Sequence, residues 1–147
     1  MTNLLLIATI AGQRVAIDAS DVEAVVEIEA VSPVPRAAPH VAGLAGLRSR
    51  VLTVIDGRAA LDMGLSAISA GREAIIVQAE GHAYALLVDT VEDVLEFSGE
   101  ILPVRGALES RWRRVAVGSV EAGDDLLLLI DVEALIGGPH AQAAHAA

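Results

Sequence analysis

The feature that most constrains the fold of this chain is an internal repeat. When the sequence is shifted by 69 residues, Val22–Ile28 (VEAVVEI) falls on Val91–Phe97 (VEDVLEF). A second match, at a shift of 75 residues, places Val54-Ile55-Asp56 on Leu129-Ile130-Asp131. Because the matches keep the same order, each half reads as a hairpin, a Val-Glu strand, a proline-containing loop, a long strand ending in Ile-Asp, and a short helix.

The apolar residues fall in short runs rich in Val, Ile and Leu, which Gly, Pro, Asp or Ser separates. Runs of this length, several of them alternating, are typical of β-strands. Tight hairpin turns are predicted at Gly12 and at Glu80-Gly81-His82, which the shift of 69 places on each other. The predicted strands are Leu4–Ala11, Arg14–Asp18, Val22–Ile28, Leu47–Ile55, Ala74–Ala79, His82–Val88, Val91–Phe97, Val115–Val120 and Leu126–Ile130.

Helices are predicted to be few and short. Arg58–Asp62 and Val132–Ile136 each follow an Asp that is suited to cap a helix. Each half of the chain is near the lower size limit for an independent core, and an open sheet would leave edges that closure into a barrel removes. The sequence therefore predicts a mainly all-β fold of two small β-barrels packed side by side, with a groove at their junction.

We expect residues 1–136 to form a single domain. Its two pseudo-repeated halves run roughly over 12–66 and 72–136, and exchange of strands between the halves is compatible with the pattern. Residues 137–147 lack an apolar period and are predicted to be a flexible tail.

The composition excludes several classes of function. The chain has no Cys, which rules out disulfides, thiol catalysis and thiolate metal sites. All ten cationic residues are Arg, so Lys Schiff-base chemistry and a Walker-type phosphate loop lack their residue. A net charge of −10 repels nucleic acid and anionic membranes, and three aromatic side chains are too few to stack bases. We expect no cofactor, no nucleic-acid partner and no direct membrane insertion.

The apolar run Leu4–Ala11 has the length of the apolar part of a signal peptide. No positive charge precedes it, and Gln13 and Arg14 follow at once. It is also shorter than the roughly 18 residues that a membrane span needs. We interpret it as a buried strand and predict a cytoplasmic protein.

No catalytic set emerges from the polar residues. The four histidines are scattered without metal-ligand spacing and are interpreted as solvated or turn residues. Asp56 and Asp89 suggest an aspartic peptidase, but Gly57 and Val91 break the Asp-Thr-Gly pattern that each site requires. No Ser lies in a Gly-x-Ser-x-Gly elbow. We predict no enzymatic activity, and the aspartic peptidase stays as an alternative.

Two arginine-rich segments are candidate binding sites. Arg111-Trp112-Arg113-Arg114 is either an exposed surface for an acidic partner or a loop whose Trp plugs a barrel end. Gly46-Leu47-Arg48-Ser49-Arg50-Val51 places two arginines where a strand begins beside a Gly-rich turn. Arg suits a partner surface because its stem packs on apolar neighbours while its guanidinium pairs with a carboxylate.

Around this second segment the chain resembles the CheW-type coupling proteins of bacterial chemotaxis. Pro35–Asp56 is similar to the family's proline loop, its Asn-Leu-Arg-Gly turn and its apolar strand ending in Asp-Leu-Arg. Val15–Ile28, Leu87–Val94 and Gly118–Asp131 match further family strands in the right order, so the likeness covers residues 4–136. The chain departs from the pattern by having Gly46-Leu47-Arg48-Ser49 at the turn and Asp56-Gly57-Arg58 after it.

The resemblance implies two tandem five-stranded, SH3-like barrels and no catalysis. It implies an adaptor that joins the cytoplasmic tips of methyl-accepting chemoreceptors to the regulatory domain of a CheA-type histidine kinase. We predict that Arg48, with Arg50 beside it, anchors a receptor helix in the groove, and that Val22, Val25 and Leu47 form its apolar wall. The kinase would meet a second face, barrel against barrel.

Two alternatives stay open. One is a CheW-like scaffold of a non-flagellar pathway that serves pili or development. The other is a small β-barrel binding protein without a signalling role, which a polar junction between the barrels would favour.

Overall fold

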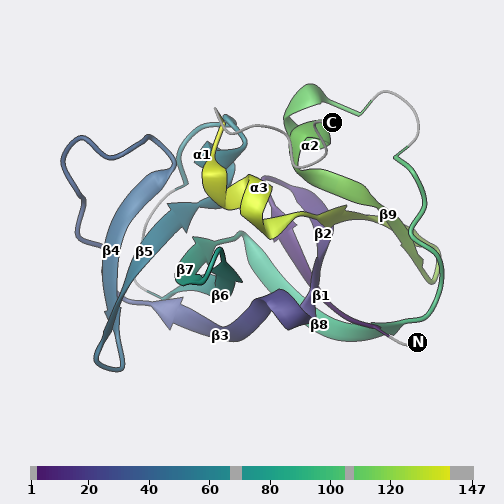
Figure 1. The fold of residues 1–147 in the computed structure, drawn as a ribbon, viewed down its shortest axis with the longest axis horizontal. Helices are drawn as coiled ribbons and strands as arrows, with labels where there is room; N and C mark the ends of the chain where they lie inside the picture. Colours follow the sequence, from purple (N-terminus) through teal and green to yellow (C-terminus); the bar gives the residue numbers. More distant parts are fainter. Residues whose placement is uncertain (1–2, 67–70, 105–107, 140–147) are drawn as a thin grey trace.

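Two five-stranded sheets lie side by side in the protein, each curled on itself (Figure 1). The structure is a computed structural model that describes residues 3–66, 71–104 and 108–139. The strands are β1 (Asn3–Ile10), β2 (Gln13–Asp18), β3 (Val22–Ile28), β4 (Val41–Leu47), β5 (Arg50–Asp56), β6 (Arg72–Ala79), β7 (His82–Leu87), β8 (Thr90–Phe97), β9 (Ala116–Ala122) and β10 (Asp125–Ile130). The predicted mainly β fold is confirmed.

The helices are short and follow strands. They are the 3-10 turn η1 (Ala19–Asp21), α1 (Gly57–Ala60), α2 (Ser110–Val115) and α3 (Val132–Gly137). The side chain of Asp56 accepts from the first amides of α1, and that of Asp131 accepts from Ala134 N in α3. The predicted aspartate caps are confirmed, whereas α2 was not predicted.

The two sheets share one topology. The order β8-β1-β2-β10-β9 is called barrel A here, and the order β3-β6-β7-β5-β4 is called barrel B. The two orders coincide when β1 to β5 are matched with β6 to β10. Each barrel also contains one parallel pair, β2 with β10 in barrel A and β5 with β7 in barrel B.

The barrels do not follow the sequence halves 12–66 and 72–136. Barrel B is one continuous stretch, β3 to β7, while barrel A combines β1 and β2 with β8 to β10. Each half therefore gives its first hairpin to the sheet that the other half completes. Because of this exchange, the segment that forms barrel B lies between β2 and β8 of barrel A in the chain. The chain therefore connects the two barrels at both ends of that segment.

In both barrels, a glycine allows a returning loop to pass close to a strand. In barrel B the loop after β3 returns to β4, where Ser32 and Leu44 exchange two backbone hydrogen bonds of 2.8 Å. In barrel A, Leu102 and Ser119 do the same with two bonds of 2.8 Å. A Cβ on Gly43, or on its counterpart Gly118, would overlap the carbonyl oxygen of the returning loop.

The largest apolar cluster lies at the seam between the barrels rather than inside either of them. It joins residues of β1, β2 and β10 in barrel A to residues of β5, β6 and β7 in barrel B, and the three helices contribute to it. Ile10, Ile17, Ile75 and Leu86 are fully buried there. Each barrel interior holds a smaller cluster of its own. The junction is thus apolar, which argues against the alternative that needed a polar one.

One strand prediction is wrong in an informative way. Leu47–Ile55 is not one strand, because the chain turns at Arg48-Ser49 between β4 and β5. The strand β4 was missed because its sequence, VAGLAGL, is rich in Gly and Ala, which are uncommon in strands.

The interpretation of the histidines as solvated or turn residues holds for His40 as a turn residue, since it lies in the turn that precedes β4. His40 is buried, and its Nε2 lies 2.9 Å from the carbonyl oxygen of Ile136 at the end of α3. It is therefore not a solvated residue. His140 and His145, with most of the predicted tail 137–147, lie outside the described residues.

We predict that Gly43→Ala destabilises the protein by about 2–3 kcal/mol, because the new Cβ meets backbone and the φ of +149° disfavours an L-residue. The free energy of unfolding is measured in urea. Gly46→Ala is the control, because it lies in the same strand and its new Cβ would meet only the carbonyl oxygen of Arg50, at an ordinary contact distance of 4.0 Å. Equal losses in both variants would contradict this account of Gly43.

Candidate partner-docking surface

Arg48 lies at the exposed tip of the β4–β5 hairpin. No hydrogen bond or ion pair joins its guanidinium to the described part of the chain. Leu47, just before the tip, is half-buried and packs against the interior cluster of barrel B. Arg48 is therefore carried by an anchored hairpin and is open to solvent, as a partner-binding arginine has to be.

The turn that presents Arg48 carries backbone strain. Arg48 has a φ of +47° and Ser49 a φ of +70°, both in the left-handed region. The β1–β2 and β6–β7 turns have the same pair of positive φ values, but their second residue is Gly12 or Gly81. Glycine adopts this conformation without steric penalty, whereas Ser does not. The hairpin with the exposed arginine is thus held in a less favourable turn than its two counterparts.

Arg50 has a different role from Arg48. Its Nη1 donates to Glu23 Oε2 at 2.6 Å, and Gln78 Nε2 donates to the other oxygen of Glu23 at 2.8 Å. These bonds link β5, β3 and β6, and the bond from Arg50 lowers the pKa of the Glu23 carboxyl. Arg50 therefore positions the start of β5, and its guanidinium is not free in the way that Arg48 is.

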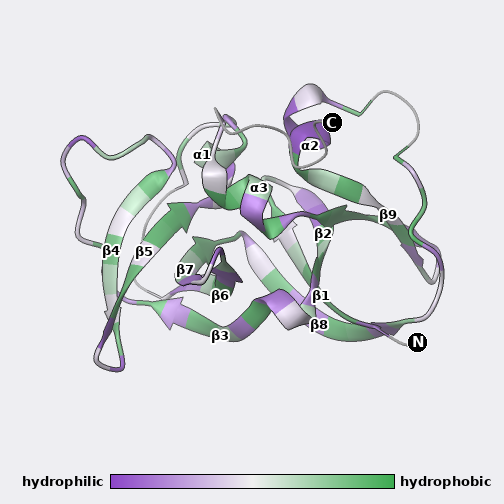
Figure 2. Ribbon diagram, viewed as in Figure 1, coloured by the Kyte–Doolittle hydropathy of each residue, from purple (hydrophilic) through white to green (hydrophobic). Residues whose placement is uncertain are grey.

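The predicted apolar wall lies on two different parts of barrel B. Val22 packs against the seam cluster, while Leu47 packs against the barrel interior. Val25 lies between them in sequence on β3, in the hydrophobic stretch 24–26 between the hydrophilic residues Glu23 and Glu27 (Figure 2). Its side chain is 43% exposed, so it is available to a partner.

A further exposed apolar position was missed by sequence reasoning. The repeat places Val25 of β3 on Val94 of β8, and Val94 is 47% exposed. The strands β3 and β8 are equivalent edges of the two sheets and follow one another along the lower side of the molecule in Figure 1. The same shift of 69 residues that revealed the repeat would have pointed to Val94.

The Arg111–Arg114 segment is a helix rather than a loop. Trp112 is buried in the seam cluster between the barrels, so it is not the exposed residue of a partner surface. Arg114 donates to the carbonyl oxygens of Ala134 at 2.9 Å and of Ala60 at 2.6 Å, so it joins the ends of α3 and α1. Burial lowers the pKa of Arg114. These two residues serve the packing of the helices.

Asp56 and Asp89 are held in separate structural sites. Asp56 is buried and accepts from α1 amides and from Ser66, whose Oγ lies 2.6 Å away. Asp89 accepts from the amide of Gly12 at 2.9 Å. No hydrogen bond joins the two carboxylates within the described residues, so the shared-proton pair of an aspartic peptidase is not formed.

Comparison with known proteins gives this architecture its family. The CheW-like domain family matches residues 4–139. The chain belongs to the CheW family. A probable chemotaxis protein CheW of Rhizobium etli is 31% identical over 111 residues, which cover 75% of this chain and 72% of the relative. A chemotaxis protein CheW of Rhizobium meliloti is 28% identical over 114 residues, covering 77% and 74%.

A solved structure shows the same fold. The crystal structure of the scaffolding protein TtCheW from Thermoanaerobacter tengcongensis matches with a TM-score of 0.79 at 22% identity, covering 92% of each chain. The resemblance found in the sequence is confirmed, and as a CheW-type protein the chain is an adaptor of chemotaxis signalling. The CheW family consists of scaffolding adaptors that are generally not catalytic. No helix among the described residues has the length and apolar character to cross a membrane.

We predict that Ser49→Gly stabilises this CheW-type protein by about 1 kcal/mol, because glycine removes the penalty of the left-handed conformation. The midpoint of urea unfolding is the measurement. Ser98→Gly, at an exposed position without a positive φ, is the control and should destabilise slightly through added chain entropy. A Ser49→Gly variant that is less stable than wild type would contradict the strained turn.

We predict that Arg50→Ala raises the pKa of Glu23 toward the ordinary value of a glutamate, because the charged hydrogen bond that lowers it is lost. Carbon NMR of the Glu23 carboxyl during a pH titration measures this. In the wild type, the stabilisation from this pair is present above the unfolded pKa of Glu23 and is lost as the pH falls through the lowered folded pKa. Arg111→Ala, which removes another exposed arginine, should leave the Glu23 titration unchanged.

Proposed function

We propose that this protein is a non-catalytic cytoplasmic adaptor that couples chemoreceptors to a histidine kinase. Its partners are the cytoplasmic tips of methyl-accepting chemoreceptors and the regulatory domain of a CheA-type kinase. Residues 1–136 act as one unit, because the two barrels share the seam cluster. Membership of the CheW family supports this proposal, and the polar groups most suggestive of catalysis are used as caps and turn contacts.

The observation that carries the proposal is the exposed guanidinium of Arg48 on an anchored hairpin. An arginine of this kind pairs with a carboxylate of a receptor helix while neighbouring apolar side chains cover the contact. Leu47 and Val25 supply apolar surface in barrel B, and Val22 supplies it at the seam. Arg50 keeps the hairpin in place through Glu23.

Coupling without chemistry requires unequal binding. An adaptor transmits a receptor signal only if it binds one state of the receptor or of the kinase more tightly than the other. The receptor uses the Arg48 surface, and the kinase uses a second face, barrel against barrel. Because the seam is one continuous apolar cluster, the two faces belong to a single rigid body. Such a body transmits a signal through the relative position of its bound partners and not through a covalent change.

We predict that Arg48→Ala lowers affinity for the receptor tip by about 30-fold, the loss expected for a hot-spot arginine worth about 2 kcal/mol. Titration of a purified receptor-tip fragment measures affinity, and phosphate transfer by the kinase in the three-component complex measures coupling. Arg111→Ala is the matched control, since it removes an exposed arginine on α2. If Arg48→Ala binds the receptor and activates the kinase as well as the control does, Arg48 is not the anchor.

A further inference from the structure

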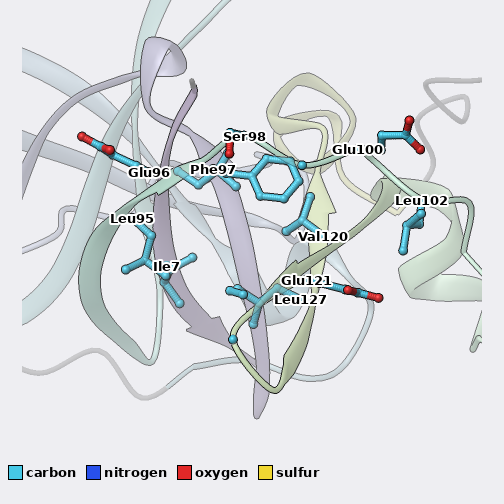
Figure 3. A pocket seen from close by; sticks show the side chains of 14 residues that line it. Ile7, Leu95, Glu96, Phe97, Ser98, Glu100, Leu102, Val120, Glu121 and Leu127 are labelled. Carbon is cyan, nitrogen blue, oxygen red and sulfur yellow. The ribbon is translucent and has the colours of Figure 1, made fainter. Parts of the chain in front are cut away.

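Barrel A has an open mouth at the end of β8. A hollow of about 630 Å³ opens between the end of β8 and strand β9. Figure 3 shows the side chains of Ile7, Leu95, Phe97, Val120 and Leu127 turned toward one another around it. These side chains come from β1, β8, β9 and β10, so the hollow leads into the interior of the barrel.

Equivalent positions of the two barrels differ in the size and in the exposure of their apolar side chains. The repeat places Ala122 of barrel A on Leu47 of barrel B, and both pack against the interior cluster of their barrel. Barrel B has the larger side chain of Leu47 at this position, whereas barrel A has the single methyl group of Ala122, which lines the hollow. Leu95 is 39% exposed, while its counterpart Val26 is half-buried against the interior of barrel B. Barrel A therefore leaves uncovered the apolar surface that barrel B buries.

The rim of the hollow has one sign of charge. Glu96, Glu100 and Glu121 line it, and no cation is among the described lining residues. Their carboxylates point outward, away from the ring of Phe97 (Figure 3). No ion pair joins any of the three to a cation in the described ranges. A site of this kind suits an apolar group that enters the hollow while positive charges beside it meet the rim.

We infer that the mouth of barrel A is a docking site for a protein segment that inserts an apolar side chain flanked by basic residues. The apolar side chain contacts Phe97, Val120 and Leu127, and the flanking arginines or lysines pair with Glu100 and Glu121. This surface is separate from the Arg48 hairpin, which belongs to barrel B and carries the opposite charge. The inference is therefore independent of the receptor contact proposed above.

The test uses the full chain and two short peptides as probes. One peptide carries a leucine between two arginines, and the other carries the same leucine between two glutamates. Titrations are followed by amide chemical shifts in NMR spectra of the protein. The basic peptide is expected to bind saturably and to shift the amides of residues 95–100 and 120–123, and the acidic peptide is expected to cause no such shifts.

Two variants locate the site. Ala122→Leu places in barrel A the side chain that barrel B has at this position, and it is expected to abolish binding of the basic peptide while the protein stays folded. Glu100→Arg with Glu121→Arg reverses the rim and is expected to weaken binding at least tenfold, which corresponds to about 1.4 kcal/mol. Asp124→Arg changes a charge on the same hairpin but outside the lining, and is the control.

The inference is overturned if the basic peptide gives no saturable shifts at millimolar concentration, or if it binds at other residues. It is equally overturned if the acidic peptide binds as well as the basic one. Unchanged affinity in both the Ala122→Leu and the rim-reversed proteins would also show that the peptide does not use the hollow.

Discussion

The apolar seam between the barrels is the interaction on which the rest of this structure depends. Strands from both sheets bury isoleucines and leucines against one another there, and each such side chain contributes about 1.5–3 kcal/mol. Neither barrel interior has a cluster of comparable extent. Small barrels of this size are marginal alone, so the shared core is what makes them stable together. It also fixes the relation between the surfaces that partners meet.

The surfaces themselves follow from small departures from the internal symmetry. The β4–β5 hairpin of barrel B has Arg48-Ser49 at its tip, whereas the equivalent β9–β10 hairpin of barrel A has Gly123-Asp124, so one hairpin tip is basic and the other acidic. A leucine packs against the interior of one barrel, where an alanine lines the hollow of the other. Duplication thus supplied two similar scaffolds, and a few substitutions at their hairpin tips gave each end different binding chemistry. An adaptor needs this asymmetry, because two identical ends would not distinguish its partners.

The repeat allowed much of the fold to be predicted from the sequence. The pair Val22–Ile28 and Val91–Phe97 identified the equivalent edge strands, and Asp56 and Asp131 identified two helix starts. The turn at Arg48-Ser49 was missed because it lacks the glycine that marks the other two turns of its type. Its strand β4 has too few β-branched residues to be recognised.

The candidate site was predicted less completely, for a physical reason. Arg48 was identified from its local context, but the bond from Arg50 to Glu23 joins residues 27 apart whose strands meet only in the folded barrel. The open end of barrel A depends on Ala122 lying opposite β8, which no local pattern reveals. Contacts of this kind are set by which sheet each hairpin joins, and that choice is made by burial of the seam.

Because the segment that forms barrel B lies between strands of barrel A in the chain, the two barrels are completed at different times during synthesis on the ribosome. Barrel B is continuous and has all its strands once β7 has been synthesised, while β1 still lacks β8 and β2 still lacks β10, its parallel neighbour. The β1–β2 hairpin therefore keeps apolar residues uncovered until β8 and β10 have been synthesised. Pairing over so long a sequence separation is slow, and a waiting hairpin is exposed to aggregation. Barrel A is accordingly completed after barrel B, at the moment when β10 pairs with β2.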